Sequence, residues 1–235
     1  MDKTIGIIGG LGTETSCSFC LNVNNSIKKI SEGQPRLVME NVPISHKALN
    51  TIARGGFSAE VLGLLVDSVK RLNRAKVDLI VIPCNTVHVF INDLRKISDV
   101  PVLSIIEETA TACKDKSFMR VGVLGSTTTI KEELYFAELR KQSIEMIIPN
   151  EEDQHFVSEC IIRIVNQNTV PEDKQRMIEI IERMNEKGAE AIILGCTDLF
   201  LIITPEDIAV PLINSTEVLE NGVVNWLRNN DGEEK

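Results

Sequence analysis

Short apolar runs alternate with longer amphipathic stretches along almost the whole chain. The Val, Ile and Leu content of the apolar runs is continuous rather than alternating, a pattern typical of strands that are covered on both faces. They predict strands at residues 4–9, 36–42, 78–83, 101–105, 119–124, 143–148, 190–194 and 210–213. Strands that alternate with helices favour parallel sheets built from β-α-β units, so the fold class is α/β.

The amphipathic stretches predict the helices. In the clearest one, residues 58–75, apolar positions recur at helical spacing after Ser58, which is a suitable N-cap. Further helices are predicted at 13–31, 87–97, 107–115, 130–141, 152–167, 172–187 and 215–229. The segment 43–57 is predicted to be a loop, and residues 229–235 a frayed tail.

Two pairs of segments repeat in the same order. Val77–Thr86 is echoed by Ala189–Thr197, and Thr4–Gly9 is echoed by Arg120–Gly125. The repeats predict two similar halves, with the boundary between them at Val100-Pro101. The second repeat is complete near Leu199, so the last helix is expected to return to the first half. The predicted domains are therefore 1–99 plus 212–235, and 100–211.

Composition narrows the function classes. The chain has 235 residues, of which 43% are hydrophobic and 25% charged, and a net charge of −9. Because no basic run offsets this charge, binding to nucleic-acid backbones is disfavoured. No apolar run is long enough for a membrane span, and the N-terminus lacks the pattern of a signal peptide. We expect a cytoplasmic protein whose six cysteines are thiols rather than disulfides.

The repeats each deliver a cysteine, Cys84 and Cys196, directly after a strand. Ligands in open α/β sheets bind beyond the carboxyl ends of the strands, so both thiols should lie at that edge. A cysteine at a helix N-terminus is also favoured as the thiolate. The competing interpretation is two ordinary core cysteines, since Cys is often buried. Their matched positions in the two repeats favour a site.

Two thiols that face each other across a cleft can remove a proton from one face of a carbon and return one to the other. Proton transfer over roughly 3–3.5 Å on each side implies a sulfur–sulfur distance on the order of 7–8 Å. The charge that develops on the substrate needs hydrogen-bond donors. Suitable donors and backbone N–H groups are expected at Gly10, Leu11, Asn85, Thr86, Ser126, Thr129 and Thr197.

Three segments resemble the signature segments of the aspartate/glutamate racemase superfamily. They are Gly6-Ile7-Ile8-Gly9-Gly10-Leu11-Gly12, Pro83-Cys84-Asn85-Thr86-Val87-His88 and Leu194-Gly195-Cys196-Thr197-Asp198. The resemblance spans the chain in order and implies two pseudo-symmetric Rossmann-like domains, a catalytic cysteine from each, no pyridoxal phosphate and no metal. It also implies a homodimer and L- and D-aspartate, possibly also glutamate, as substrates. Asp198 departs from the pattern, since the aspartate branch usually has Glu there and glutamate racemases His.

A dicarboxylic substrate needs cationic partners. We expect Arg54, beside Gly55-Gly56, to bind a carboxylate with its planar fork, and Arg163 to supply a second cation. Lys47 and His46 are alternatives in the same segment. For both arginines the competing interpretation is a solvated surface charge.

Other functions stay open. The motif Gly10-x-Gly12-x-x-Thr15 falls one glycine short of a dinucleotide fingerprint, so no cofactor is expected. A related isomerase or decarboxylase of a small dicarboxylic acid is possible, although a decarboxylase needs only one cysteine. A non-catalytic ligand-binding protein is the third alternative, and an unusually reactive thiol would argue against it.

Overall fold

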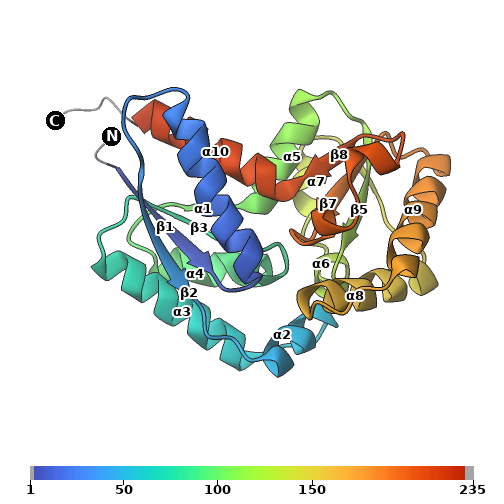
Figure 1. Cartoon of the computed structure of the whole chain (residues 1–235), viewed down its shortest axis with the longest axis horizontal. Coiled ribbons are helices and arrows are strands. Elements are labelled where there is room, and N and C mark those ends of the chain that lie inside the picture. The colour runs from blue at the N-terminus through green and yellow to red at the C-terminus, as the bar shows by residue number, and fades with distance from the viewer. Residues whose placement is uncertain (1–2, 231–235) are drawn as a thin grey trace.

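Two four-stranded parallel sheets form the framework of the molecule, as seen in a computed structural model that describes residues 3–230 (Figure 1). The first sheet has the order β2-β1-β3-β4, and the second has the order β6-β5-β7-β8. The strands are β1 Thr4–Gly9, β2 Arg36–Asn41, β3 Leu79–Val81, β4 Val102–Leu103, β5 Arg120–Gly125, β6 Glu145–Ile147, β7 Ala191–Gly195 and β8 Leu212–Asn214. All the predicted strands are present, and the matching strand orders confirm the α/β fold with two similar halves.

The register of the central strands brings their carboxyl ends together. Ile7 pairs with Val81 in the first sheet, and Gly125 pairs with Gly195 in the second. The central strands β1, β3 and β7 are buried at every position. Their unbroken apolar sequence is explained by helices that cover both faces of each sheet.

The helices alternate with the strands. In the first half they are α1 Thr13–Lys28, α2 His46–Ala53, α3 Ala59–Arg74, α4 Ile91–Ile97 and α5 Ile105–Asp115. In the second half they are α6 Thr127–Lys131, α7 Phe136–Lys141, α8 Glu151–Val165, α9 Pro171–Glu186 and α10 Ser215–Asn230. Short 3₁₀ turns lie at Thr86–Phe90, Leu199–Leu201 and Pro205–Asp207. Ser58 caps α3 as predicted, because its side chain accepts a hydrogen bond from the Val61 N–H. Within residues 3–230 no helix combines the length and apolarity needed to cross a membrane.

Two expectations were wrong in detail. The segment 43–57 is not a plain loop: it contains the two-turn helix α2, which Ser45 caps through the Ala48 N–H. The predicted helix 130–141 is divided into α6 and α7, because Glu133 adopts a left-handed conformation with φ 52°. Asn229 and Asn230 belong to α10, and the remainder of the predicted tail lies outside the described residues.

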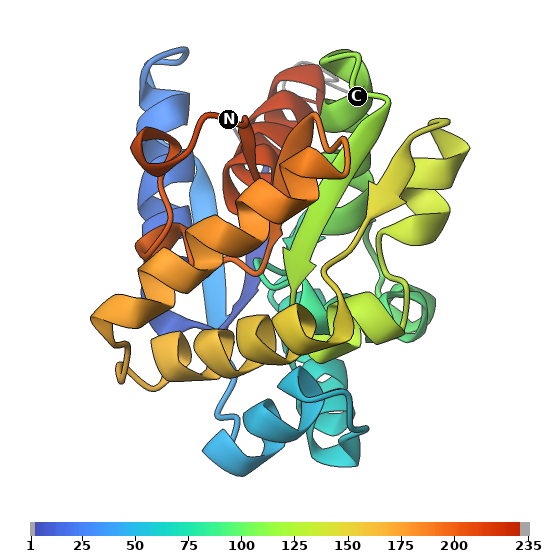
Figure 2. The ribbon, with the colours of Figure 1, turned by 90° about the vertical axis from the view of Figure 1, so that its right-hand side faces the viewer.

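One hydrophobic core is continuous between the two halves. It contains Ile7 of the first sheet, Ile193 of the second and Val223 of α10. Helix α10 packs against α1 and α5 and crosses the top of the molecule between the sheets (Figure 1). On the other face of the second sheet lie α8 and α9, which are in front in Figure 2. The domain division at 99/100 and 211/212 stays a prediction.

The interface between α10 and α1 buries one carboxyl group. Glu220 is 9% exposed and accepts a hydrogen bond of 2.9 Å from the Asn22 amide. Burial raises the pKa of Glu220 to about 7 from an ordinary 4.5. Between those two pH values the unfolded chain loses the proton while the folded chain keeps it, so stability falls as pH rises through this window. The loss reaches at most about 3 kcal/mol above pH 7.

We therefore expect Glu220→Gln to stabilise the protein at pH 8 by about 1–3 kcal/mol and to have little effect at pH 4. The amide preserves the hydrogen bond to Asn22 and has no charge to bury. Urea unfolding at both pH values measures the difference. Glu182→Gln, at an exposed position on α9, is the matched control. A Glu220→Gln gain that is equal at pH 4 and pH 8 would contradict the titration argument.

Candidate active site

The two cysteines of the repeats line one narrow pocket between the halves of the molecule. Cys84 comes from the first half, three residues beyond β3, and Cys196 directly follows β7 in the second. Both are free thiols. The residues after each cysteine also line the pocket: Asn85, Thr86, Thr197 and Asp198. Leu11 reaches it from the first glycine loop, which connects β1 to α1. The remaining lining residues come from two helices: Leu49, Asn50, Ile52 and Ala53 from α2, and Ile161, Ile162 and Val165 from α8. The ends of β3 and β7, one from each sheet, thus bring the two cysteines to the same pocket.

The pocket is closed in this structure. Its volume is about 30 Å³, which is room for little more than a water molecule. Helix α2 forms one wall and is held to the second half at two points. Arg54 donates two hydrogen bonds of 2.8 and 2.9 Å to Glu159 of α8, and the Thr128 hydroxyl donates to the Ile52 carbonyl. The space between α2 and α8 beside the thiols is thus smaller than an amino acid.

Burial keeps both thiols protonated. It raises the pKa of Cys84 to about 11, and the carboxylate of Asp198 adds to the effect. The pKa of Cys196 is also well above its usual value, first through burial and then through Asp198. Backbone N–H groups beyond each cysteine lower both pKa values, as expected at a helix start, but burial outweighs them. The helix start thus favours the thiolate as expected, but burial has the larger effect on both pKa values.

Asp198 is the acidic side chain that raises the pKa of both thiols. Its side chain is 6% exposed and accepts a hydrogen bond of 2.5 Å from the Thr15 hydroxyl. Burial raises its pKa. The first glycine loop passes close by: a Cβ added to Gly12 would lie 3.2 Å from Oδ1 of Asp198. In the sequence Asp198 was only a departure from a pattern, although its place two residues after Cys196 could have marked it as a site residue.

A buried hydrogen-bond network connects the two cysteine loops. The Tyr135 hydroxyl donates to Oδ1 of Asn85 over 2.6 Å, and Nδ2 of Asn85 donates to the Ser215 hydroxyl over 3.0 Å. Ser215 in turn donates to the Leu194 carbonyl over 2.8 Å. Asn85 is thus held between the strand end that carries Cys84 and the one that carries Cys196. Nothing in the sequence pattern indicated Tyr135 or Ser215, because they reach the site only through the fold.

The predicted hydroxyl donors form a second connection. Thr86 lies 2.9 Å from the Ser126 hydroxyl, which lies 3.0 Å from that of Thr129 and also accepts from its N–H. Of these, only Thr86 lines the pocket, together with Thr197 and Leu11. Gly10 lines the adjoining, wider pocket. Ser126 and Thr129 therefore lie outside the pocket and connect to it only through the Thr86 hydroxyl.

His88 holds the Cys84 loop from behind. Burial lowers the pKa of its imidazole to about 4, so the ring is neutral at physiological pH. Nδ1 lies 2.8 Å from the Cys84 carbonyl, and Nε2 accepts from the Ile105 N–H over 3.2 Å. With Nε2 as the acceptor, Nδ1 carries the proton and donates it to the carbonyl. Both ring nitrogens of His88 are thus occupied by backbone groups, which fixes the Cys84 loop.

The two predicted cations are not among the residues that line the pocket. Arg54, at the C-terminus of α2, is half-exposed and pairs with Glu159. Arg163 pairs with Asp173 and lies 5.5 Å from the centre of the Phe156 ring. Their binding of a substrate carboxylate stays a prediction. In the part of the chain that the structure describes, no group of three or more His, Cys, Asp or Glu residues could hold a metal ion.

The chain is similar in sequence to known amino-acid racemases. The chain is 26% identical over 225 residues to the broad specificity amino-acid racemase RacX of Bacillus subtilis, covering 94% of this chain and 96% of the relative. Over 160 residues it is 29% identical to the glutamate racemase of a Sulfurihydrogenibium species, covering 66% of this chain and 56% of that protein.

Solved structures share the fold. The aspartate racemase of Picrophilus torridus superposes with a TM-score of 0.78 at 24% identity, covering 95% of this chain and 94% of that one. For the glutamate racemase of Francisella tularensis in complex with D-glutamate, the TM-score is 0.69 at 19% identity, with 100% and 85% covered. The profile of one family, Asp/Glu/Hydantoin racemase, matches residues 8–221. The chain therefore belongs to the Asp/Glu/hydantoin racemase family.

Proposed function

We propose that this protein is an amino-acid racemase that inverts the α-carbon with Cys84 and Cys196 as its two bases, without pyridoxal phosphate or a metal. The observation that carries the proposal is that two free thiols from opposite halves line one pocket. A decarboxylase needs only one such group. A non-catalytic binding protein has no use for two thiols at matched strand ends.

The reaction is a pair of proton transfers. The thiolate of one cysteine takes the α-proton from one face, and the electron pair of the broken C–H bond spreads into the carboxylate. The thiol of the other cysteine donates its proton to the opposite face and forms the new C–H bond. The cysteines end with exchanged protonation states, so the enzyme runs in both directions. Thr86, Thr197 and the backbone of the first glycine loop are the donors proposed for the developing negative charge.

The proposal requires that one thiol lose its proton when the substrate binds. Both are protonated in the closed pocket. The α-ammonium group of an amino acid brings a positive charge between them, and a nearby opposite charge favours the thiolate. Asp198 is placed to accept a hydrogen bond from the same ammonium group, because it lines the pocket with the thiols.

The resemblance to the aspartate branch favours L- and D-aspartate, and possibly glutamate, as substrates, and it favours a cytoplasmic homodimer. The similar proteins include an aspartate racemase, a glutamate racemase and a broad specificity amino-acid racemase, and all three racemise amino acids. The resemblance alone favours aspartate, whereas the residues that line the thiol pocket include no Lys or Arg for its side-chain carboxylate.

The test is α-hydrogen exchange. We expect the pure protein in D₂O to replace the α-proton of at least one L-amino acid by deuterium, seen by proton NMR, and to form the D-enantiomer, seen by chiral chromatography. Added pyridoxal phosphate or chelator should change neither rate. If no proteinogenic amino acid exchanges its α-proton, the proposed function is wrong.

Two roles for Arg54 can be distinguished by kinetics: a clamp between α2 and α8, or a binder of the substrate carboxylate. If it only clamps α2 to α8, Arg54→Ala and Glu159→Ala should change kcat/KM equally, and by the same factor for aspartate and methionine. If Arg54 instead leaves Glu159 to bind a side-chain carboxylate, Arg54→Ala should weaken the binding of aspartate by about 1.5–3 kcal/mol, typical of a hydrogen bond to a charged group, and Glu159→Ala should not. Steady-state kinetics on both variants distinguishes the two roles.

A further inference from the structure

The walls that face the two thiols are mainly apolar. Helix α2 contributes Leu49, Ile52 and Ala53 together with one amide, Asn50, and helix α8 contributes Ile161, Ile162 and Val165. Among the pocket-lining residues Asp198 is the only one with an ionisable side chain other than the thiols, and its charge is negative. A substrate carboxylate moved from water into such surroundings loses hydration and gains no opposite charge.

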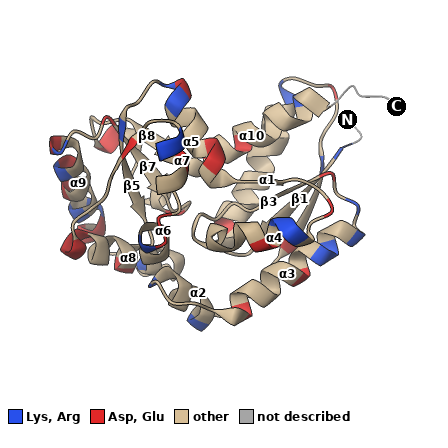
Figure 3. Ribbon diagram, turned by 180° about the vertical axis from the view of Figure 1, so that it is seen from behind, with Lys and Arg blue, Asp and Glu red and all other residues tan. Residues whose placement is uncertain are grey.

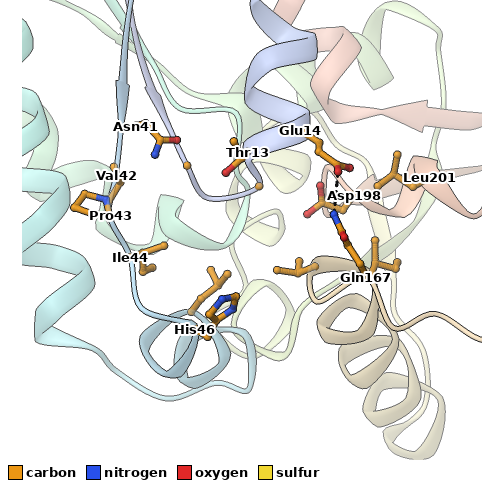
Figure 4. A pocket seen from close by; sticks show the side chains of 15 residues that line it. Thr13, Glu14, Asn41, Val42, Pro43, Ile44, His46, Gln167, Asp198 and Leu201 are labelled. Carbon is orange, nitrogen blue, oxygen red and sulfur yellow. Dashed lines mark hydrogen bonds between the residues drawn. The ribbon is translucent and has the colours of Figure 1, made fainter.

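The adjoining pocket offers one group that can become cationic, the imidazole of His46, but no permanent cation. It has a volume of about 530 Å³ and shares Leu49, Val165 and Asp198 with the thiol pocket, so it is the approach to the thiols. Its lining includes a second carboxylate, Glu14, and no Lys or Arg. Figure 4 shows Glu14 and Asp198 on the same side of this pocket, with His46 on the other. Gln167 donates to Glu14 over 3.0 Å, which orients that carboxylate without neutralising it.

The cations of the described chain are located elsewhere. Figure 3 shows many of the Lys and Arg residues on the outer helices α3, α4 and α9. Arg54, at the C-terminus of α2, makes a two-pronged ion pair with Glu159, so the pair adds no net charge to the cleft. Arg163 is paired in the same way with Asp173.

We propose that the amino acid inverted at this site has an uncharged, mainly aliphatic side chain, and that the apolar walls on α2 and α8, together with Asp198 and Glu14, select against a side-chain carboxylate. This inference rests on the proposed racemase function for the identity of the ligand as an amino acid. The side chain lies between the walls of α2 and α8, and the α-ammonium faces Asp198. Aspartate and glutamate would place a second carboxylate against the two acidic side chains.

The first experiment is calorimetric binding of L-methionine, L-leucine, L-lysine, L-aspartate and L-glutamate, together with α-hydrogen exchange for each. We expect methionine or leucine to bind and exchange best, with kcat/KM at least about 100-fold above that of aspartate, as for a site with no partner for a polar group. A preference for aspartate or glutamate would overturn the proposal. A preference for lysine would also overturn it, and would assign selectivity to Glu14. Binding of methionine without exchange would leave the selectivity intact and refute the racemase function.

The second experiment adds the missing cation. Val165→Lys places an ammonium group on the wall shared by both pockets, in the last turn of α8, where a cation suits the helix dipole. It should shift the aspartate-to-methionine ratio of kcat/KM toward aspartate at least about tenfold, the size of one modest charge-assisted contact. Leu49→Lys on the opposite wall is the second variant if Val165→Lys does not fold.

The matched control is Leu21→Lys. Leu21, on α1, is 62% exposed and is not among the residues that line either pocket, so its variant has the same net charge without a cation at the site. Its ratio should change less than about twofold, as for an exposed and screened charge. Equal shifts in Val165→Lys and Leu21→Lys would show that overall charge, not the lining of the thiol pocket, sets the selectivity, and would overturn the proposal.

Discussion

Cys84→Ala and Cys196→Ala should each abolish racemisation while the protein stays folded. Inversion needs a base on one face of the α-carbon and an acid on the other, so neither single variant retains a complete path. Removing a positioned acid or base lowers a proton-transfer rate by roughly 10²–10⁴-fold. Chiral chromatography of each variant with the best wild-type substrate measures the loss. Cys17→Ala, at an exposed thiol on α1, is the control and should retain wild-type activity.

The serine variants distinguish two bases from one. Cys84→Ser and Cys196→Ser each leave one thiol, so each should still exchange the α-proton of one enantiomer with D₂O, and the two variants should prefer opposite enantiomers. Circular dichroism and urea unfolding show whether the fold is intact. Near wild-type racemisation by either alanine variant, or loss of activity explained by unfolding, would remove the support for paired thiols.

The second large effect expected is a steep rise of activity with pH. Burial raises the pKa of Cys84 to about 11, and Cys196 is shifted in the same direction, so only a small fraction of either is thiolate at pH 7. The thiolate is the base, and its fraction grows about tenfold for each pH unit below the pKa. We therefore expect kcat/KM, which reports the free enzyme and the free substrate, to rise from pH 7 until the α-ammonium group of the substrate begins to lose its proton.

Thiol alkylation separates the enzyme's titration from that of the substrate amine. Iodoacetamide reacts with thiolates, so Cys84 and Cys196, identified by mass spectrometry, should react slowly at pH 7 and faster with rising pH. Exposed Cys17 is the internal comparison. A plateau in kcat/KM by pH 8, or alkylation of the pocket thiols faster than that of Cys17 at pH 7, would show that the free enzyme has an open, activated pocket.

Local sequence determined the framework. The strands were visible because each is a continuous apolar run, and Ser58 marked a helix start that the structure confirms. The doubling of Cys84 and Cys196 was visible because the chain repeats its strand–cysteine unit, and parallel strands end at a common edge. Helix α2 was missed because only eight residues separate Ser45 from Arg54, with Pro43 before and Gly55-Gly56 after, so local signals favoured a loop.

What only the tertiary structure decided is the environment of the thiols. Tyr135 and Ser215 reach Asn85 from positions that no periodicity connects. The helix-start N–H groups were readable in sequence, but the burial that outweighs them depends on α2 and α8 closing from opposite halves. Arg54 and Arg163 read as free cations, whereas the fold pairs them with Glu159 and Asp173. Charge pairing and desolvation depend on distances between segments far apart in the chain, and those distances exist only in the folded protein.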